Sequence, residues 1–256
     1  MIRAGLVSVT FRKLSPQEIT DLVARSGLEG IEWGGDIHAP HGDLQRAREV
    51  RKMTLDKGLA VAAYGSYYHV GESEPALFQS VLESAVELGA PTIRVWAGKK
   101  GSADAPAEYR QAIVSESRRI AELAAGMNIS ISYEFHRKTL TDTDESAKKL
   151  LEEVARPNIR TYWQPPTGSP IEYCLEGLKA ISPWLSNVHV HYWGATPSEQ
   201  LPLAEGAGVW RRYLEAISSF GGNRYAMIEF VKGGTPEAFR QDAAALKSWV
   251  AALNSR

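Results

Sequence analysis

Short runs of apolar, β-branched and aromatic residues alternate along the chain with longer stretches in which apolar residues recur every three or four positions. The first pattern is typical of strands and the second of amphipathic helices. Gly, Pro and Asn bound the short runs, as they bound strands in general. Eight runs predict strands, at residues 4–11, 28–33, 59–65, 92–98, 129–135, 159–164, 187–193 and 225–231.

Recognisable helix signals separate these runs. Ser15, Pro16 and Glu18 form a capping box with proline at the first helical position. Thr143 and Thr235 predict two further N-caps, each followed by an acidic residue in the first turn. Glycines predict the ends of several helices, at Gly27, Gly58, Gly89 and Gly126.

The order of strand and helix is strict, and it repeats eight times. A helix that connects two neighbouring strands by a right-handed crossover makes those strands parallel. Eight such units in 256 residues without a linker predict one (β/α)8 TIM barrel, a single domain over residues 1–256. An open doubly wound sheet is the alternative, but it requires a glycine-rich phosphate loop after the first strand, and residues 9–12 do not form one.

Charge and composition narrow the classes of function. The 29 basic and 30 acidic residues give a net charge of −1, whereas proteins that bind nucleic acid or membrane surfaces usually carry a basic excess. The one cysteine, Cys174, excludes a disulfide framework and a CxxC metal site. No apolar run approaches roughly 18 residues, and the first residues lack the features of a signal peptide. We therefore expect a soluble cytoplasmic protein.

Two glutamates stand at the predicted mouth of the barrel, where the active site of such a fold lies. In the strand at 129–135, Ser132 and Glu134 share one face, and the small polar residues of that face suit the barrel interior. Glu229 takes the equivalent place in the strand at 225–231. Because these strands are not neighbours, the two carboxylates can flank a bound substrate.

An imidazole and an amide are predicted at the same level. In the strand at 187–193 the valines face the helices, so His189 and His191 point inward, with His191 nearer the mouth and His189 in the layer below. Gln164 ends the strand at 159–164. Carboxylate, imidazole and amide oxygen ligands suit Mn²⁺, Mg²⁺ or Co²⁺. The two glutamates, Gln164 and His191 therefore predict a divalent metal site.

Further strand-end side chains are candidates for substrate binding. Arg94 can hold an anion or a sugar oxygen, or it can form an ion pair with Glu32, which also points inward. Lys232 can neutralise a substrate oxyanion or remain solvated, and the strand-end tryptophans can form apolar walls. The predicted substrate contacts are Arg94, Trp96, His136, Trp193, Glu32 and Lys232.

The barrel order, the segment GLEGIEW at 27–33, Glu134, the HVH triplet at 189–191 and Glu229 resemble the xylose isomerase-like superfamily of sugar phosphate isomerases and epimerases. The resemblance covers essentially the whole chain. It implies a divalent cation, often Mn²⁺, with Mg²⁺, Co²⁺ and Zn²⁺ as alternatives. It places the metal ligands at Glu134, Gln164, His191 and Glu229. The family usually has Asp where this chain has Gln164, and often His where it has Thr167.

The resemblance implies an isomerase or epimerase of carbohydrate metabolism that acts on a keto sugar. Glu134 and Glu229 would combine metal binding with proton transfer at the carbon next to the carbonyl, and the metal would stabilise the enediolate. A metal-dependent lyase or dehydratase acting on a keto-sugar or 3-keto-glycoside is the alternative. An endonuclease for abasic DNA is disfavoured by the net charge. The expected partner is a small sugar, with neither nucleic acid nor membrane, and a homo-oligomer stays open.

Overall fold

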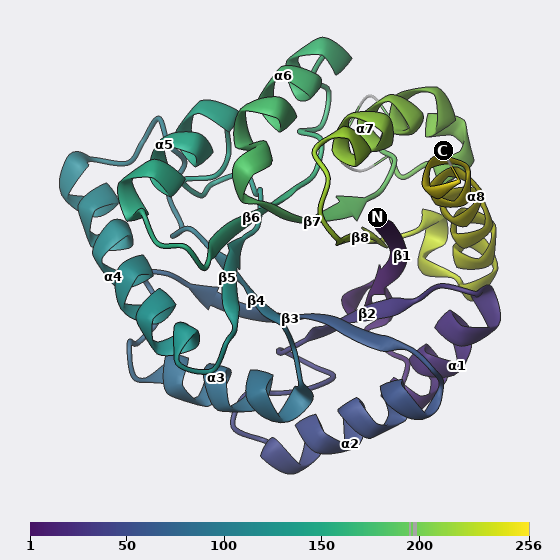
Figure 1. The fold of residues 1–256 in the computed structure, drawn as a ribbon, viewed down its shortest axis with the longest axis horizontal. Coiled ribbons are helices and arrows are strands. Elements are labelled where there is room, and N and C mark those ends of the chain that lie inside the picture. The colour runs from purple at the N-terminus through teal and green to yellow at the C-terminus, as the bar shows by residue number, and fades with distance from the viewer. Residues whose placement is uncertain (195, 197–198, 256) are drawn as a thin grey trace.

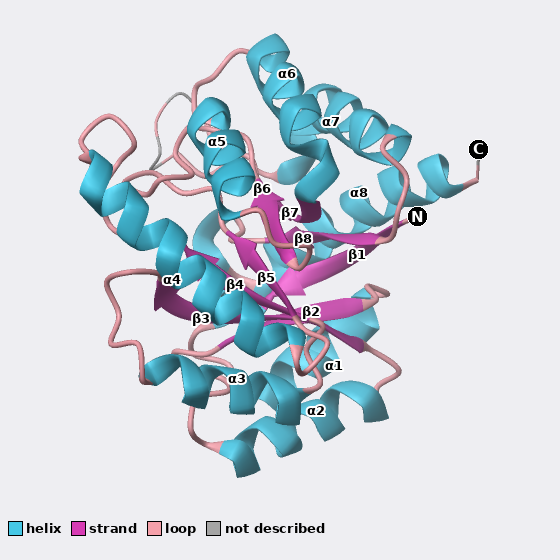
Figure 2. Cartoon of the chain, turned by 60° about the vertical axis from the view of Figure 1, so that its left-hand side comes forward, coloured by secondary structure: helices cyan, strands magenta, loops and turns pink. Residues whose placement is uncertain are grey.

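Eight parallel strands close into a barrel in sequence order, and eight α-helices surround it (Figures 1 and 2). The computed structural model describes residues 1–194, 196 and 199–255, and these counts refer to them. The predicted (β/α)8 barrel is confirmed. None of the helices in the described ranges is long and apolar enough to cross a membrane.

The elements alternate without exception along the described chain. The strands are β1 (Ile2–Val7), β2 (Gly30–Gly34), β3 (Ala60–His69), β4 (Thr92–Trp96), β5 (Ser130–Tyr133), β6 (Ile159–Trp163), β7 (Leu185–Val190) and β8 (Arg224–Ile228). The α-helices are α1 (Pro16–Ser26), α2 (Leu44–Asp56), α3 (Leu77–Leu88), α4 (Ala107–Ala125), α5 (Asp144–Val154), α6 (Ile171–Ile181), α7 (Ala207–Ser219) and α8 (Pro236–Asn254).

The predicted helix starts are confirmed. The hydroxyl of Ser15 accepts a hydrogen bond from the Glu18 backbone N–H, and the Glu18 carboxylate accepts one from the Ser15 backbone N–H at 2.7 Å. Thr143 and Thr235 cap α5 and α8 in the same way, each accepting from the backbone N–H three residues later. Gly27 ends α1 in the left-handed conformation, with φ of 69°.

Several strands differ from their predicted limits. The run at 4–11 is a strand only as far as Val7, and Ser8–Phe11 form the short 3-10 helix η1. The side chain of Ser8 explains the change, because its hydroxyl accepts a hydrogen bond from the Gly34 backbone N–H and contacts His38 Nδ1, both at 2.9 Å. A side chain that bonds to the backbone in this way competes with the sheet ladder.

The third strand is longer than predicted and irregular. It continues to His69, and its register with β4 shifts between Gly65 and Tyr68. Tyr67 lies in this bulge with φ of 56°, a left-handed conformation that is strained for a tyrosine. Strands β5 to β8 end earlier than predicted. Four candidate site residues therefore lie just beyond the strand ends: Glu134, Gln164, His191 and Glu229.

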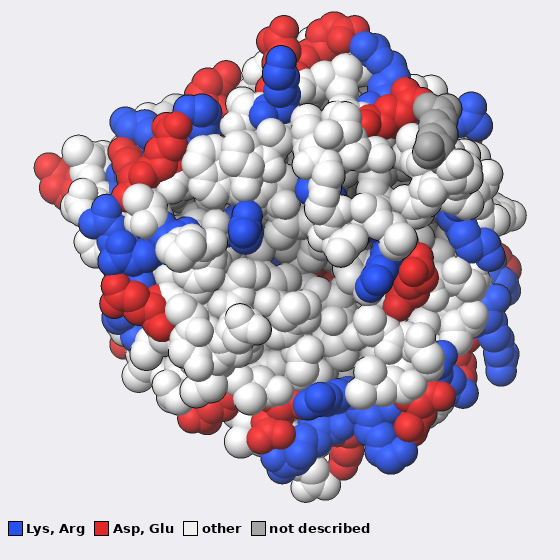
Figure 3. Space-filling view, viewed as in Figure 1, with Lys and Arg blue, Asp and Glu red and all other residues white. Residues whose placement is uncertain are grey.

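The apolar core lies between the barrel and the helices, whereas the barrel interior also holds polar side chains, from Thr92 at the start of β4 to Glu134 just beyond β5. Inside, the hydroxyls of Thr92 and Ser132 are 2.8 Å apart, and Ser132 is 3.0 Å from the Ser186 hydroxyl. On the face of the molecule in Figure 3, acidic and basic side chains lie together around the rim, and no continuous basic stripe is visible. These polar groups make the barrel interior a less unfavourable environment for charged side chains at the carboxyl ends of the strands.

Candidate active site

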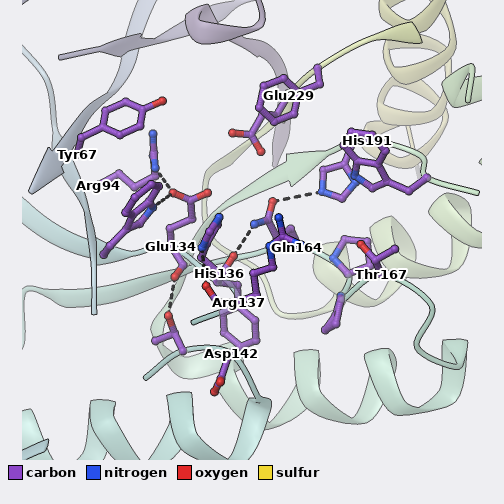
Figure 4. Close-up of a pocket in the computed structure, with 17 residues that line it drawn as sticks. Tyr67, Arg94, Glu134, His136, Arg137, Asp142, Gln164, Thr167, His191 and Glu229 are labelled. Atoms are coloured by element: carbon purple, nitrogen blue, oxygen red, sulfur yellow. Dashed lines mark hydrogen bonds and ion pairs between the residues drawn. The ribbon is translucent and has the colours of Figure 1, made fainter. Parts of the chain in front are cut away.

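A pocket of about 670 Å³ opens at the carboxyl ends of the strands (Figure 4). Its volume lies within the roughly 300–1,000 Å³ that small-molecule sites occupy. It brings together eight of the residues predicted from the sequence: Arg94, Trp96, Glu134, His136, Gln164, His191, Trp193 and Glu229. The convergence agrees with the location of active sites at this end of the fold.

Two carboxylates converge on one histidine below the pocket floor. His189 Nδ1 lies 3.2 Å from Glu229 Oε2 and 3.8 Å from Glu134 Oε1. Its other nitrogen, Nε2, lies 3.5 Å from Glu32 Oε2. Burial disfavours the imidazolium, but the charges of Glu229 and Glu32 outweigh burial and raise the pKa of His189 to about 9.

The donor set of this cluster fits a divalent cation. One ligand atom each from Glu134, His189 and Glu229 lies within 4.8 Å of the others. Nδ1 of His189 is buried and has no hydrogen-bond partner in the described structure, although it faces both carboxylates. A carboxylate on the second ring nitrogen, here Glu32, is the usual support of a metal-binding histidine. These three residues could therefore hold a metal ion through two oxygens and one nitrogen.

Arg94 is the second cation of the cluster. Its Nε donates to Glu32 Oε1 at 2.6 Å, and its Nη1 pairs with Glu134 Oε2. Burial alone would raise the pKa of Glu32, but the Arg94 and His189 charges lower that pKa to about 2. Gly65 makes room for the ion pair, since a β-carbon there would stand 2.7 Å from Arg94 Nη2. The predicted ion pair with Glu32 thus forms, and Arg94 also lines the pocket.

Gln164 and His191 form a separate pair beside the cluster. Gln164 Oε1 lies 3.2 Å from His191 Nε2, and its amide nitrogen donates to the Phe135 carbonyl (Figure 4). Because an amide oxygen only accepts, Nε2 of His191 carries the proton, and burial lowers the pKa of this histidine to about 4. The ligand roles predicted for Gln164 and His191 remain predictions.

Sequence reasoning missed that His189 belongs to the carboxylate cluster. Alternation places His189 inside the barrel correctly, but it does not give the reach of the glutamates. The Glu229 backbone N–H donates to the Val190 carbonyl at 3.0 Å, so Glu229 stands level with the end of β7. Its side chain then extends back into the barrel as far as His189. A buried HxH pair below two glutamates leaves either histidine as a ligand candidate.

His136 presents a free nitrogen to the pocket. Its ring stacks on Trp96 with 4.9 Å between the centroids, and its Nδ1 lies 2.7 Å from the Arg137 carbonyl oxygen. That contact requires the proton on Nδ1, because a carbonyl oxygen only accepts. Burial lowers the pKa of His136, so the ring is neutral near pH 7 and Nε2 carries a lone pair.

Two predicted substrate contacts lie outside the pocket lining. Glu32 is fully buried beneath Arg94, and this position gives it contact with Arg94 and His189 in place of a substrate. Lys232 is exposed on the short helix η4 (Lys232–Gly234), where the chain has already turned away from β8. Among the tryptophans, Trp96 and Trp193 line the pocket, while Trp33 and Trp163 are core residues.

Tyr67 is a pocket residue that sequence patterns did not reveal. Its hydroxyl accepts a hydrogen bond from Arg12 Nη2 at 3.0 Å, and its ring faces the Arg94 guanidinium at 5.3 Å. The bulge in β3 turns this side chain into the pocket. The sequence signal, a glycine followed by aromatic residues at a strand end, is too common to identify such a bulge.

Comparison with known proteins agrees with this architecture. Residues 20–249 match the xylose isomerase-like TIM barrel family. The chain is 29% identical over 251 residues to a 3-dehydroshikimate dehydratase of Bacillus anthracis, covering 91% of this chain and 83% of that protein.

Solved structures show the same fold. The probable 3-dehydroshikimate dehydratase AsbF of Bacillus anthracis superimposes with a TM-score of 0.80 at 22% identity, over 96% of this chain and 98% of that one. The D-psicose 3-epimerase of Clostridium cellulolyticum gives a TM-score of 0.73 at 13% identity, over 98% and 99% of the two chains. The chain belongs to the xylose isomerase-like TIM barrel family.

Proposed function

We propose that the protein is a metal-dependent dehydratase that removes water from a polyhydroxylated ketone. The observation that carries this proposal is a neutral imidazole nitrogen on the pocket wall, Nε2 of His136, which has no hydrogen-bond partner among the described residues. Glu134 and Glu229, the bases expected from the sequence, are engaged with Arg94 and His189. The similarity to a 3-dehydroshikimate dehydratase supports the same reaction class.

One base on one face of the substrate favours elimination over epimerisation. Nε2 of His136 takes the proton from the carbon next to the carbonyl, and the C–H electrons form a carbon–carbon double bond. The hydroxyl on the next carbon then leaves with the proton that His136 has taken, so water departs and the base is restored. Epimerisation would need a second proton donor on the opposite face.

The buried cluster would assist at the carbonyl. A divalent cation held by Glu134, His189 and Glu229 would supply Lewis-acid polarisation of the carbonyl oxygen. Trp96 holds the ring of His136 by stacking, and it also donates a hydrogen bond to Glu134. The base and the acid cluster are therefore positioned by the same side chain.

A paired assay tests the reaction class. The purified protein is incubated with Mn²⁺ or Mg²⁺ in D₂O, once with 3-dehydroshikimate and once with D-tagatose. We expect loss of water from 3-dehydroshikimate, which gives an aromatic dihydroxybenzoate that ultraviolet absorption and mass spectrometry detect. Deuterium incorporation and epimer formation from D-tagatose without any water loss would favour the epimerase instead. Failure of both substrates with metal-loaded protein would contradict the proposal.

A further inference from the structure

Tyr67 reaches the pocket in a strained backbone conformation. It lies in the bulge of β3 with φ of 56°, a region that bulky residues rarely adopt. Figure 4 shows its ring beside Arg94 at one side of the pocket. Such strain persists only where surrounding contacts hold the residue, and it is common at functional sites. The contacts that hold Tyr67 in place therefore matter for the site.

Arg12 holds the Tyr67 side chain from outside the pocket lining. Its Nη2 donates to Tyr67 Oη at 3.0 Å, and its guanidinium carbon lies 5.7 Å from the centre of the tyrosine ring. Its Nη1 donates to Asp36 Oδ2 at 2.6 Å. Arg12 follows β1, Asp36 follows β2 and Tyr67 lies in β3. One guanidinium thus joins three consecutive segments at the mouth of the barrel.

The segment that carries Arg12 is itself held in place. The Ser8 hydroxyl accepts a hydrogen bond from the Gly34 backbone N–H at 2.9 Å, and the Thr10 hydroxyl accepts one from the Phe230 backbone N–H at 3.0 Å. These bonds tie the segment after β1 to the ends of β2 and β8. Arg12 therefore extends from a fixed backbone, and its planar fork of donors can hold a partner in one orientation.

Tyr67 in turn contacts the side chain that positions the proposed base. Its ring packs edge-on against Trp96, with 5.4 Å between the centroids. Trp96 stacks on His136 at 4.9 Å and donates a hydrogen bond to Glu134. A continuous series of contacts therefore leads from Arg12 through Tyr67 and Trp96 to His136.

We propose that Arg12 is a positioning residue, which holds Tyr67 and Trp96 where Trp96 aligns His136 with the substrate. This inference rests on the proposed function for the role of His136. Asp36 supports the arrangement, because its carboxylate fixes the direction of the Arg12 guanidinium. Since Arg12 lies outside the pocket lining, its loss should lower kcat and leave substrate binding almost unchanged.

A double-mutant cycle with 3-dehydroshikimate tests the link between Arg12 and Tyr67. We expect Arg12→Gln to lower kcat about tenfold, because the base is misaligned, and to change KM by less than about twofold. Tyr67→Phe lacks the hydroxyl that Arg12 holds, so adding Arg12→Gln to it should lower kcat by less than about twofold more. Arg12→Lys keeps the charge without the planar fork and should retain part of kcat.

The indole N–H signal of Trp96 gives a readout that needs no turnover. In a spectrum of ¹⁵N-labelled protein the seven tryptophans give one such signal each, and Trp96→Phe identifies the one from Trp96. We expect Arg12→Gln and Asp36→Asn to shift this signal, because the hydrogen bond to Glu134 depends on the place of the indole ring. Arg25→Gln is the matched control, at an exposed position in the last turn of α1, and should change neither the signal nor kcat.

Three results would overturn the inference. They are additive losses of kcat in the double variant, an unshifted Trp96 signal in Arg12→Gln, and a rise in KM that exceeds the loss of kcat. A lower melting temperature of Arg12→Gln with unchanged kcat per folded molecule would also overturn it, because Arg12 would then serve stability alone. A shifted Trp96 signal without any dehydration of 3-dehydroshikimate by the wild-type protein would overturn the proposed function alone.

Discussion

At the scale of single residues, His189 near the end of β7 and His191 just beyond it have different surroundings. Nδ1 of His189 faces Glu134 and Glu229, whereas His191 is bonded to Gln164. Both rings are buried. Their contrasting neighbours allow the ligand set to be tested by removing one imidazole at a time.

Metal binding should depend more on His189 than on His191. His189→Ala removes a nitrogen donor between two carboxylates, and we expect a loss of Mn²⁺ affinity of more than about tenfold. Glu229→Gln should weaken binding in the same direction, because the site loses one negative charge. Titration of the purified variants measures these affinities. Normal binding by His189→Ala together with lost binding by His191→Ala would show that His191 is the ligand.

His136 should behave as the catalytic base. His136→Gln keeps a polar side chain of similar reach, and kcat should fall by roughly 10²–10⁴. His69→Gln is the control, because His69 also contacts Trp96 and a backbone carbonyl but lies outside the pocket lining. An equal loss of kcat in both variants would indicate a packing role for His136.

The pH profile gives a second readout of the same residue. The base must be neutral to take a proton, and burial lowers the pKa of His136 below its ordinary 6.5. The activity of the wild-type protein should therefore persist below pH 6.5 and fall only as the pH drops through this lowered pKa. An acid limb of kcat/KM above pH 6.5 would not fit His136.

At the scale of elements, a buried carboxyl group links α5 to α6. Asp144 is the first residue of α5, and neither of its carboxylate oxygens has a hydrogen-bond partner in the described structure. Gly177 of α6 packs on it so closely that an added β-carbon would clash with the carboxylate. Burial, followed by the charge of Glu145, raises the pKa of Asp144 to about 7.

This carboxyl group should make the protein less stable as the pH rises. Its folded pKa of about 7 lies above the ordinary value of 3.8, so its contribution to stability is complete below pH 3.8 and is lost progressively up to about pH 7. Asp144→Asn should therefore stabilise the protein at pH 8 by on the order of a few kcal/mol, and much less at pH 4.

Urea unfolding at pH 4 and pH 8 measures the difference. Glu108→Gln, at an exposed position in the first turn of α4 and on a different helix from Asp144, is the control and should show little change. A stability difference between wild type and Asp144→Asn that is the same at both pH values would rule out titration of Asp144 as its cause.

The same scale shows how far sequence patterns reach. Periodicity and capping residues predicted all eight βα units, because Ser15 and Thr235 act through neighbours in the chain. The ends of the strands were less predictable. Ser8 leaves the ladder for a partner 26 positions away, and the bulge at Tyr67 depends on the register between β3 and β4. Such details depend on packing that no local pattern encodes.

The candidate site was predictable to a similar degree. Alternation identified inward residues that line the pocket, including Arg94, Glu134 and Glu229. It could not show how far a long side chain reaches, so the contact of Glu229 with His189 was missed. The free nitrogen of His136 was equally hidden, since it depends on one hydrogen bond to a neighbouring carbonyl.

At the scale of the whole molecule, the barrel closes where β1 pairs with β8, and α8 holds this seam. Asn254, the last residue of α8, donates to the Ile2 carbonyl at 2.8 Å and accepts from the Ile2 backbone N–H at 3.2 Å. The N-terminal amino group donates to the Gly222 carbonyl at 2.6 Å. The first strand is thus tied to its neighbour and to the last helix.

Removal of this side chain should weaken the closed barrel. Asn254→Ala takes away both hydrogen bonds to Ile2, and we expect the free energy of unfolding to fall by about 1–2 kcal/mol. Asn223→Ala is the control, since Asn223 is exposed and precedes β8. Thermal unfolding compares the two. An equal decrease in the free energy of unfolding in both variants would show that the two hydrogen bonds between Asn254 and Ile2 do not specifically stabilise the barrel.

The two cationic side chains inside the carboxylate cluster affect whether the chain can fold before it binds a metal ion. Arg94 and His189 offset most of the charge on Glu32, Glu134 and Glu229, so these carboxylates do not repel one another strongly before any ion arrives. Folding can then precede metal loading, unlike in small zinc domains that are unfolded without their ion. Protein treated with a chelator should keep its circular dichroism spectrum and regain full Mn²⁺ binding on dialysis. A newly synthesised chain would in that case fold completely in a cell depleted of the ion, and the folded protein would bind the metal once it became available.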